Sequence, residues 1–214
     1  MPLTFSYNHS GRIGLHPVGI PKKMGIVLSE GSKHFHVPYG PAITDGSLEA
    51  RFIDLKANPQ MIPVLPPCVG WPETQELLLQ INKPQSPFMT LAADQSYTKG
   101  PDPTRSVILV SFVTLCFAEI SHNAKDLLSD LVMYLQQQMD ELLQDASTML
   151  DQTLDLEIIL EIQPTFYHHH HIEGWSLTVM MIASGQEHHF VRGTWGYGIQ
   201  ILIDGLNAYA PQGS

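Results

Sequence analysis

The spacing of apolar residues between Asn123 and Ala146 restricts the fold of this chain more than any other feature. Apolar residues recur there every three or four positions, as on one face of an α-helix, and polar residues fill the positions between them. A helix of this length measures about 36 Å, enough to cross a whole sheet. We therefore predict one long amphipathic helix, with Asn123 as its N-cap and Gln137 on its exposed side. Its predicted buried side consists of Leu128, Leu131, Leu135, Met139, Leu142 and Ala146.

One strand is predicted before this helix in the sequence and one after it. Residues 106–117 form a continuous apolar and β-branched run, which is typical of a strand that is central in its sheet and buried on both faces. Residues 154–162 alternate between apolar and mostly polar side chains, which predicts one core face and one wet face. We expect the long helix to cover the strand Val107–Phe117.

The C-terminal region adds two predicted strands. Trp175–Ile182 is interpreted as one strand and Gly198–Asp204 as the last one. The glycine-rich residues Gly193–Gly198 are interpreted as a turn that enters the last strand, with Trp195 and Tyr197 packed or available to a partner. The resulting order of elements indicates an α+β fold, in which a mixed, mainly antiparallel sheet is covered by one long amphipathic helix.

The first half of the chain differs from the second half in how often proline and glycine occur. From Met1 to about Arg105, proline and glycine recur every few residues and interrupt regular elements, which predicts loops and short strands. We expect a loop-rich β segment of residues 1–105, packed on or extending from an α/β core domain of residues 106–214. The candidate elements before residue 105 are strands at Met24–Ser29, Lys33–Val37 and Leu48–Leu55 and a short helix at Glu73–Ile81.

Composition excludes several classes of protein. The chain has 11 Lys and Arg against 21 Asp and Glu, a formal net charge of −10, which disfavours sequence-specific binding to nucleic acid. The opening residues lack the pattern of a signal peptide, and no window approaches the ~18 apolar residues that a membrane helix needs. With only Cys68 and Cys116, no disulfide framework is expected.

Histidines form the most conspicuous polar clusters. They occur at residues 168–171, at 188–189 and in the triplet His34-Phe35-His36. Imidazole is a common metal ligand, and His-x-His on a strand places two rings on one face, whereas four consecutive histidines point in different directions. The candidates for a metal site are His34, His36, His188 and His189, and the favoured alternative is solvated loop histidines.

No catalytic motif is present, so we expect neither catalytic residues nor a cofactor. Glu157 and Glu161 share the polar face of one predicted strand, but positions four apart on a strand are about 13 Å apart, too far for paired acid and base catalysis. Asp151, Asp155 and Asp204 lie at predicted strand or loop ends, where turn formation explains them.

Residues 106–184 resemble the core of tail-terminator and tail-completion proteins of tailed bacteriophages. The resemblance lies in the order of strand, long amphipathic helix and antiparallel strands, and in the pattern Glu173-Gly174-Trp175-Ser176-Leu177-Thr178-Val179. It implies a non-enzymatic virion protein, made in the host cytoplasm, that forms a ring and meets other tail proteins through sheet edges and extended loops. The first hundred residues depart from that pattern, so a neck, baseplate or tail-tip variant stays open.

Three functional hypotheses follow. The first is a structural assembly protein of a phage tail or neck, expected to form a homo-oligomeric ring that contacts other tail or neck proteins. The second is a histidine-rich metal-binding protein or metal-dependent hydrolase. The third is a cytosolic binding module whose contact surface surrounds Trp195.

Overall fold

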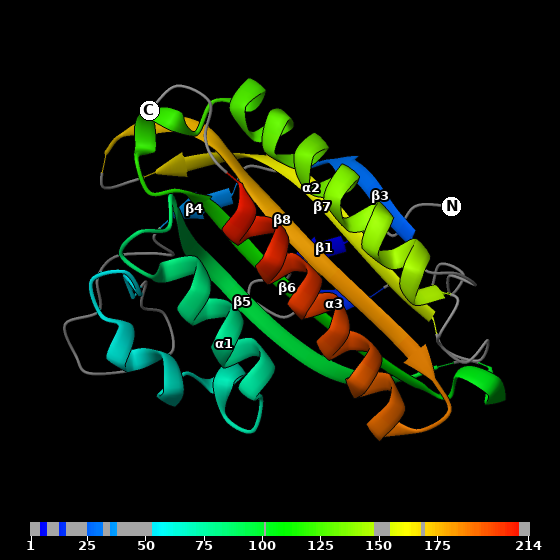
Figure 1. Ribbon diagram of the computed structural model, residues 1–214. Helices are drawn as coiled ribbons and strands as arrows, with labels where there is room; N and C mark the ends of the chain where they lie inside the picture. Colours follow the sequence, from blue (N-terminus) through cyan, green and yellow to red (C-terminus); the bar gives the residue numbers. More distant parts are fainter. Residues whose placement is uncertain are drawn as a thin grey trace.

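The computed structural model describes residues 5–7, 13–15, 25–31, 35–37, 53–100, 102–147, 155–167 and 170–209. Within these residues, a six-stranded sheet carries α-helices on one face (Figure 1). The predicted α+β class, with a mixed and mainly antiparallel sheet, is confirmed. A separate antiparallel pair is formed by β1 (Phe5–Tyr7) and β2 (Ile13–Leu15).

The large sheet draws its strands from both halves of the chain. β3 and β4 run parallel to β7, and the other pairings in this sheet are antiparallel. β4 (Phe35–Val37) pairs with the far end of β7, on the same side of that strand as β3. From border to border the order is β3 (Gly25–Glu30), β7 (Asp155–Tyr167), β8 (Ile172–Gly185), β6 (Val107–Phe117) and β5 (Phe88–Lys99).

Three α-helices lie side by side on one face of the sheet (Figure 1). α1 (Pro72–Asn82) packs against β5, α2 (Lys125–Ser147) against β3, β7 and β8, and α3 (His188–Ala208) against β8, β6 and β7. α3 lies between the other two helices and contacts both. The 3-10 turns are η1 (Pro59–Val64), η2 (Pro66–Cys68), η3 (Pro103–Arg105) and η4 (Ile120–His122).

Two predictions for the C-terminal region are wrong. The predicted turn Gly193–Gly198 and the predicted last strand Gly198–Asp204 both belong to α3. α3 also occupies the place over β6 that the sequence assigns to the long helix. The physical reason is that α3 packs on the sheet and on two neighbouring helices, so it lacks the polar stripe that makes α2 recognisable.

The long helix itself is confirmed as α2, with two corrections at its ends. Gln137 is exposed as predicted, but Leu142 is 39% exposed and lies outside the core. Asn123 does not cap the helix, because its side chain accepts from Phe117 N (2.8 Å) and donates to Phe117 O (3.0 Å). The Asn123 side chain therefore binds the backbone of the last residue of β6 instead. The fully buried side of α2 consists of Leu128, Leu131, Leu135 and Met139.

The face of the sheet opposite the helices is not a simple wet face. The sequence predicts such a face for β7, yet Asp155 is 2% exposed and Ile159 only 8%. Ile159 belongs to a small apolar cluster with Val110, Met180 and Ile182. β6 is buried along nearly its whole length, as predicted.

A polar band crosses this second face between two apolar clusters. Its hydrogen bonds join Gln163 to Thr178 (3.0 Å) and Thr178 to Thr114 (2.8 Å) across three strands. Thr165 and Ser176 form a further pair at 2.7 Å. Buried hydroxyls in this band are paired with one another, so the band fixes strand register at little cost in unsatisfied groups. Beyond it lies the second cluster, formed by Phe35, Val37, Leu91, Cys116 and Tyr167.

Candidate assembly interface

The first half of the outer edge of β5 is closed by side chains. Thr90 N donates to Asn82 Oδ1 (3.0 Å), and Phe88 N donates to Ser86 Oγ (3.2 Å). The Lys56 ammonium donates to Phe88 O (2.9 Å), and burial lowers the pKa of this lysine. A bulge at Leu91 then interrupts the ladder between β5 and β6. Three outward backbone groups of this half, Phe88 N, Phe88 O and Thr90 N, are therefore already bonded within the protein.

The second half of β5, Asp94–Lys99, is open. Gly100 N donates to Ser106 O (3.0 Å) and so points toward β6, which means that Lys99 and Tyr97 direct their backbone groups outward. Gln95 N, also outward, is held by its neighbour Asp94 at 2.9 Å. Within the described ranges, the outward groups of Tyr97 and Lys99 have no hydrogen-bond partner. We call this segment the β5 open edge.

β3 forms the opposite border, and its outer edge is open as well. Gly31 N donates to Ile162 O (2.8 Å), so Leu28 and Ile26 direct their backbone groups away from β7. These outward groups also lack a partner among the residues that the structure describes. In addition, Val27 is 41% exposed and Leu28 45% exposed, which is unusual for an edge strand that stays unpaired. We call Gly25–Glu30 the β3 open edge.

An aromatic cluster adjoins the β5 open edge. The Tyr97 ring lies 5.5 Å from the Trp71 ring and 4.7 Å from the His188 ring, centroid to centroid. Trp71 in turn meets the buried Trp195 edge-on at 5.4 Å. These contacts connect the open edge to the start of α1 and to the first turn of α3, so the edge is held on a packed support.

Arg192 packs against this aromatic cluster and is held there by Glu73. Its guanidinium lies 4.7 Å from the centre of the Trp71 ring and makes two hydrogen bonds to Glu73, at 2.9 and 2.8 Å. Burial alone would raise the pKa of Glu73, but the hydrogen bonds and charge of Arg192 outweigh it and hold that pKa below its ordinary value. The hydrogen bonds that Arg192 donates to the Glu73 carboxylate raise the pKa of Arg192. Both groups are therefore charged at neutral pH.

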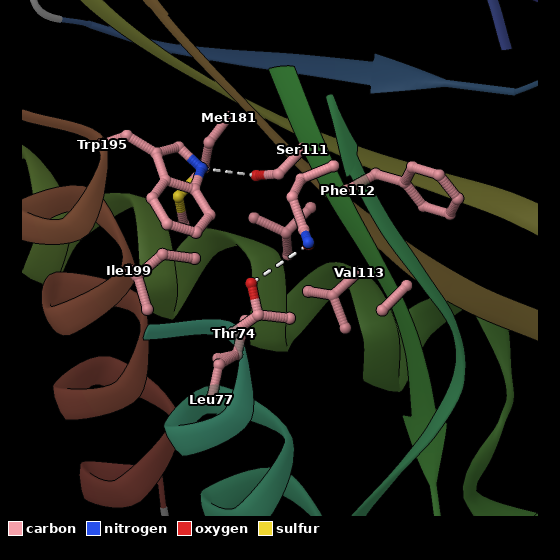
Figure 2. Close-up of a pocket in the computed structure, with 11 residues that line it drawn as sticks. Thr74, Leu77, Ser111, Phe112, Val113, Met181, Trp195 and Ile199 are labelled. Carbon is pink, nitrogen blue, oxygen red and sulfur yellow. Dashed lines mark hydrogen bonds between the residues drawn. The ribbon is translucent and has the colours of Figure 1, made fainter. Parts of the chain in front are cut away.

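A cavity lies between the sheet and the helices α1 and α3, and it is too small for a substrate (Figure 2). The centre of a water molecule can occupy only about 10 Å³ of it, the lower limit for a single water. Trp195 Nε1 donates to Ser111 Oγ (2.7 Å), and Thr74 Oγ1 donates to Gln95 Oε1 (3.1 Å). Because these polar atoms are paired, the cavity supports the strand above it and is not an active site. Its apolar lining includes Leu77, Val113, Val179, Met181 and Ile199.

A second depression, of about 550 Å³, is open and lies at the far end of the sheet. The Lys125 ammonium lies 4.8 Å from the centre of the Trp175 ring there and 2.8 Å from Glu30 Oε1. Glu173 and Pro164 also line it. The lining contains no histidine or cysteine, and its one lysine is already paired, so it presents no nucleophile with an adjacent base.

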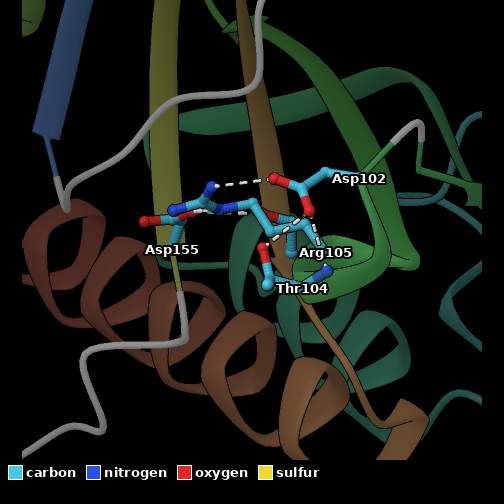
Figure 3. A network of polar contacts seen from close by, with 5 residues as sticks. Asp102, Thr104, Arg105 and Asp155 are labelled. Atoms are coloured by element: carbon cyan, nitrogen blue, oxygen red, sulfur yellow. Dashed lines mark hydrogen bonds and ion pairs between the residues drawn. The ribbon is translucent and has the colours of Figure 1, made fainter.

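The buried carboxylate Asp155 belongs to a structural network rather than to a turn (Figure 3). It forms an ion pair with Arg105, which also lies 3.8 Å from Asp102, and accepts from Ser184 at 3.4 Å. Asp102 holds Thr104 through two hydrogen bonds of 2.8 Å. The network ties the hairpin between β5 and β6 to the first residue of β7. Its charges are paired, and no catalytic role follows from it.

The residues predicted for a metal site are not brought together. His36 lies on β4 beside the end of β7, whereas His188 and His189 follow the end of β8 that pairs with the start of β7. The β7 residues at these two places, Phe166 and Asp155, are eleven positions apart, which is about 36 Å of extended chain. His34, His168, His169 and Asp151 lie outside the described residues. In the part of the chain that the structure describes, no three His, Cys, Asp or Glu side chains group as a metal site.

The two cysteines are free and buried, Cys68 in η2 and Cys116 in β6. Burial raises the pKa of Cys68 to about 11 and that of Cys116 to about 12. Since the thiolate is the reactive form, neither thiol is activated at neutral pH.

Sequence reasoning missed the two open edges. Whether an edge is open depends on which strands border the sheet and on which backbone groups other segments cover. No local pattern encodes this, although the exposed Val27 and Leu28 stand in a segment correctly predicted as a strand.

No protein-family model, curated protein or solved structure matches this chain. Among the helices of the described residues, none is both long enough and apolar enough to cross a membrane.

Proposed function

We propose that this protein is a non-enzymatic assembly protein that joins copies of itself and other proteins through the open edges of its sheet. The observation that carries this proposal is the presence, among the described residues, of two open edges on opposite borders, with Val27 and Leu28 exposed on one and Tyr97 on the other. Unpaired edges template the addition of further strands, and most proteins block them.

The contrast within β5 supports this reading. Its first half is closed by Lys56, Asn82 and Ser86 and ends in a bulge, which are the usual means of blocking an edge. In its second half Asp94 holds Gln95 N, but the outward groups of Tyr97 and Lys99 are unpaired among the described residues and lie beside the aromatic cluster. Tyrosine and tryptophan are the residues most enriched in protein interfaces.

Within this class, we propose a component of the tail or neck of a tailed bacteriophage, located in the virion. The support is the resemblance of residues 106–184, whose order of elements agrees with β6, α2, β7 and β8. The net charge of −10 also suits a surface past which DNA moves without binding.

The oligomeric state tests this proposal. Mass photometry and negative-stain microscopy of the purified protein at micromolar concentration should reveal rings or another defined oligomer. A second series at ~0.5 M salt weakens the repulsion between acidic copies and should strengthen assembly, because charges are then screened within a few ångströms. A monomer under both conditions, with no assembly on addition of candidate tail or neck proteins, would overturn it.

A further inference from the structure

The β3 and β5 open edges run in opposite directions, as antiparallel pairing between two copies requires. β3 is parallel to β7, and the successive antiparallel pairings of β7, β8, β6 and β5 make β5 antiparallel to β3. The two strands lie at opposite borders of the sheet (Figure 1). A second copy placed alongside the first, with its helices on the same side, therefore presents its β3 to the β5 open edge as an antiparallel neighbour.

The side chains on the two edges also match. On β5, the backbone groups of Gln95 face the outer edge, and its side chain lines the cavity between the sheet and the helices. On β3, Glu30 reaches Lys125 of α2, and Ile26 packs against the core on the helix side. Residues whose outward backbone groups can pair thus carry their side chains on the same face in both strands. Opposite residues of a ladder must share a face, so pairing does not require the sheet to turn over.

One register places exposed apolar side chains opposite one another. With Tyr97 opposite Leu28, Thr98 is opposite Val27, and these strands overlap from residue 94 to 99 and from 26 to 31. Tyr97 is 36% exposed, Leu28 45% and Val27 41%. A shift of two residues in either direction places Leu28 opposite Gln95 or Lys99 instead of Tyr97.

We infer that β5 of one copy pairs with β3 of the next in this register, so that the sheet continues from copy to copy. The inference rests on the proposed assembly function and names the partner of each edge, a second copy of this chain. Because the two surfaces in contact are different, the interface is head-to-tail, and repetition closes a ring or extends a filament.

Proline variants test each edge separately. Leu28→Pro and Tyr97→Pro each remove an outward N–H and leave the internal ladders of β3 and β5 intact, a position where edge strands accept proline. Both variants should be monomeric at concentrations where the unchanged protein assembles. The matched controls Leu28→Ala and Tyr97→Ala lose the same side chains but keep the N–H, and should still assemble. Circular dichroism and thermal melting verify that each proline variant is folded.

Mixing the two proline variants distinguishes head-to-tail pairing from symmetric pairing. Each variant keeps one usable edge, so an equal mixture should form a dimer with one copy of each and nothing larger. Dimerisation of Leu28→Pro alone would indicate β5 paired with β5, and that of Tyr97→Pro alone β3 paired with β3; either result overturns the inference. If both variants assemble like the unchanged protein, this pairing is wrong and the assembly function still stands. If the unchanged protein never assembles, the proposed assembly function and the proposed edge pairing are both wrong.

Cross-linking tests the register and does not depend on proline. Opposite positions of a non-hydrogen-bonded pair lie about 4.5 Å apart at Cα, which suits a disulfide. Under a mild copper oxidant, the double variant Val27→Cys with Thr98→Cys should give a ladder of covalent multimers on a non-reducing gel. The control, Val27→Cys with Ser96→Cys, is two residues out of register and should give none. The proposed register is wrong if the first double variant assembles but gives no covalent ladder. It is also wrong if only the second double variant gives a ladder.

Discussion

α2 and α3 are similar in length but are built on different principles. α2 lies at the border of the helix layer, where it buries one side and exposes residues such as Gln137 to solvent. α3 lies between α1 and α2 and over three strands, so residues on several of its sides are buried, among them Val191, Trp195 and Ile203. A border helix needs one apolar stripe, whereas a central helix needs apolar residues around most of its circumference.

Glycine shows the same difference. α2 contains none, whereas α3 contains glycines at closely packed positions. A Cβ at Gly205 would lie 3.0 Å from Leu135 Cδ2 of α2, and one at Gly198 would lie 3.1 Å from Leu156 Cδ2 of β7. α3 thus approaches its neighbours at distances that leave little room for side chains. Substitutions in α3 should therefore be harder to accommodate than those on the outside of α2.

The largest loss should follow removal of the Trp195 ring. This side chain is fully buried, and Trp195→Ala should cost about 3–5 kcal/mol of the free energy of unfolding, because it leaves a large cavity. It also leaves Ser111 without its donor. Denaturant unfolding measures the loss. Trp195→Phe keeps most of the ring volume and should lose clearly less; equal losses would mean that packing is not the main contribution.

Leu135→Ala should cost about 2–5 kcal/mol, because this residue of α2 is fully buried against α3. Leu142, on the same helix but 39% exposed, is the matched control. Its change to alanine should cost less than about 1 kcal/mol. If the two variants melted alike, the contact between α2 and α3 described above would be wrong.

Two glycines of α3 should respond in opposite directions. Gly198→Ala should cost about 1–3 kcal/mol, since the added methyl group meets Leu156 and Met181 at 3.1–3.3 Å. Gly193 has nothing within 4 Å of the same position, and Gly193→Ala should stabilise the helix by roughly 0.5–1 kcal/mol. Chemical denaturation of both variants measures the difference, and a stabilised Gly198→Ala variant would contradict the close approach.

Acid should weaken the attachment of α3 to α1. The lowered pKa of Glu73 means that its ion pair with Arg192 stabilises the protein above the ordinary glutamate value of 4.5. This stabilisation is lost as the pH falls through the lower pKa of the folded state. The Tm of the unchanged protein should exceed that of Glu73→Gln at neutral pH and converge with it below pH 4.5. A constant gap at all pH values would exclude the ionised pair as its cause.

The smallest effect is expected on the outside of α2. Gln137 is exposed, so Gln137→Ala should change the stability of an isolated protomer by less than about 0.5 kcal/mol. If it left the protomer intact but reduced assembly in mass photometry, this side of α2 would be part of an interface.

Periodicity predicted elements wherever one side of an element faces the core. It located α2, β7, β8 and the short helix α1, and the continuous apolar run located β6. It failed for α3, where glycines resembled a turn and the isoleucines after Gly198 resembled a strand. It also missed β5, because the bulge at Leu91 disrupts the alternation and Ala-Ala-Asp-Gln has low strand propensity.

The candidate interface was less accessible to sequence reasoning. Histidines drew attention because imidazole binds metals, yet His36 and His188 lie at opposite ends of the sheet. Among the described strands, β3 pairs only with the distant β7 and β5 only with β6, which leaves both at the borders of the sheet. Side chains close only part of the outer edge of β5. Such features depend on the arrangement of whole strands.

The parallel pairing of β3 with β7 has a consequence during synthesis of the chain. Ser29 and its hydrogen-bond partner Glu161 are 132 residues apart, so a ribosome that adds 5–20 residues per second needs roughly 7–26 s to pass from one to the other. During that time β3 has been made but its partner strand has not. The N-terminal border of the sheet is therefore completed late, after β7 emerges, and an interrupted or truncated chain carries Val27 and Leu28 in a segment with no strand to receive it.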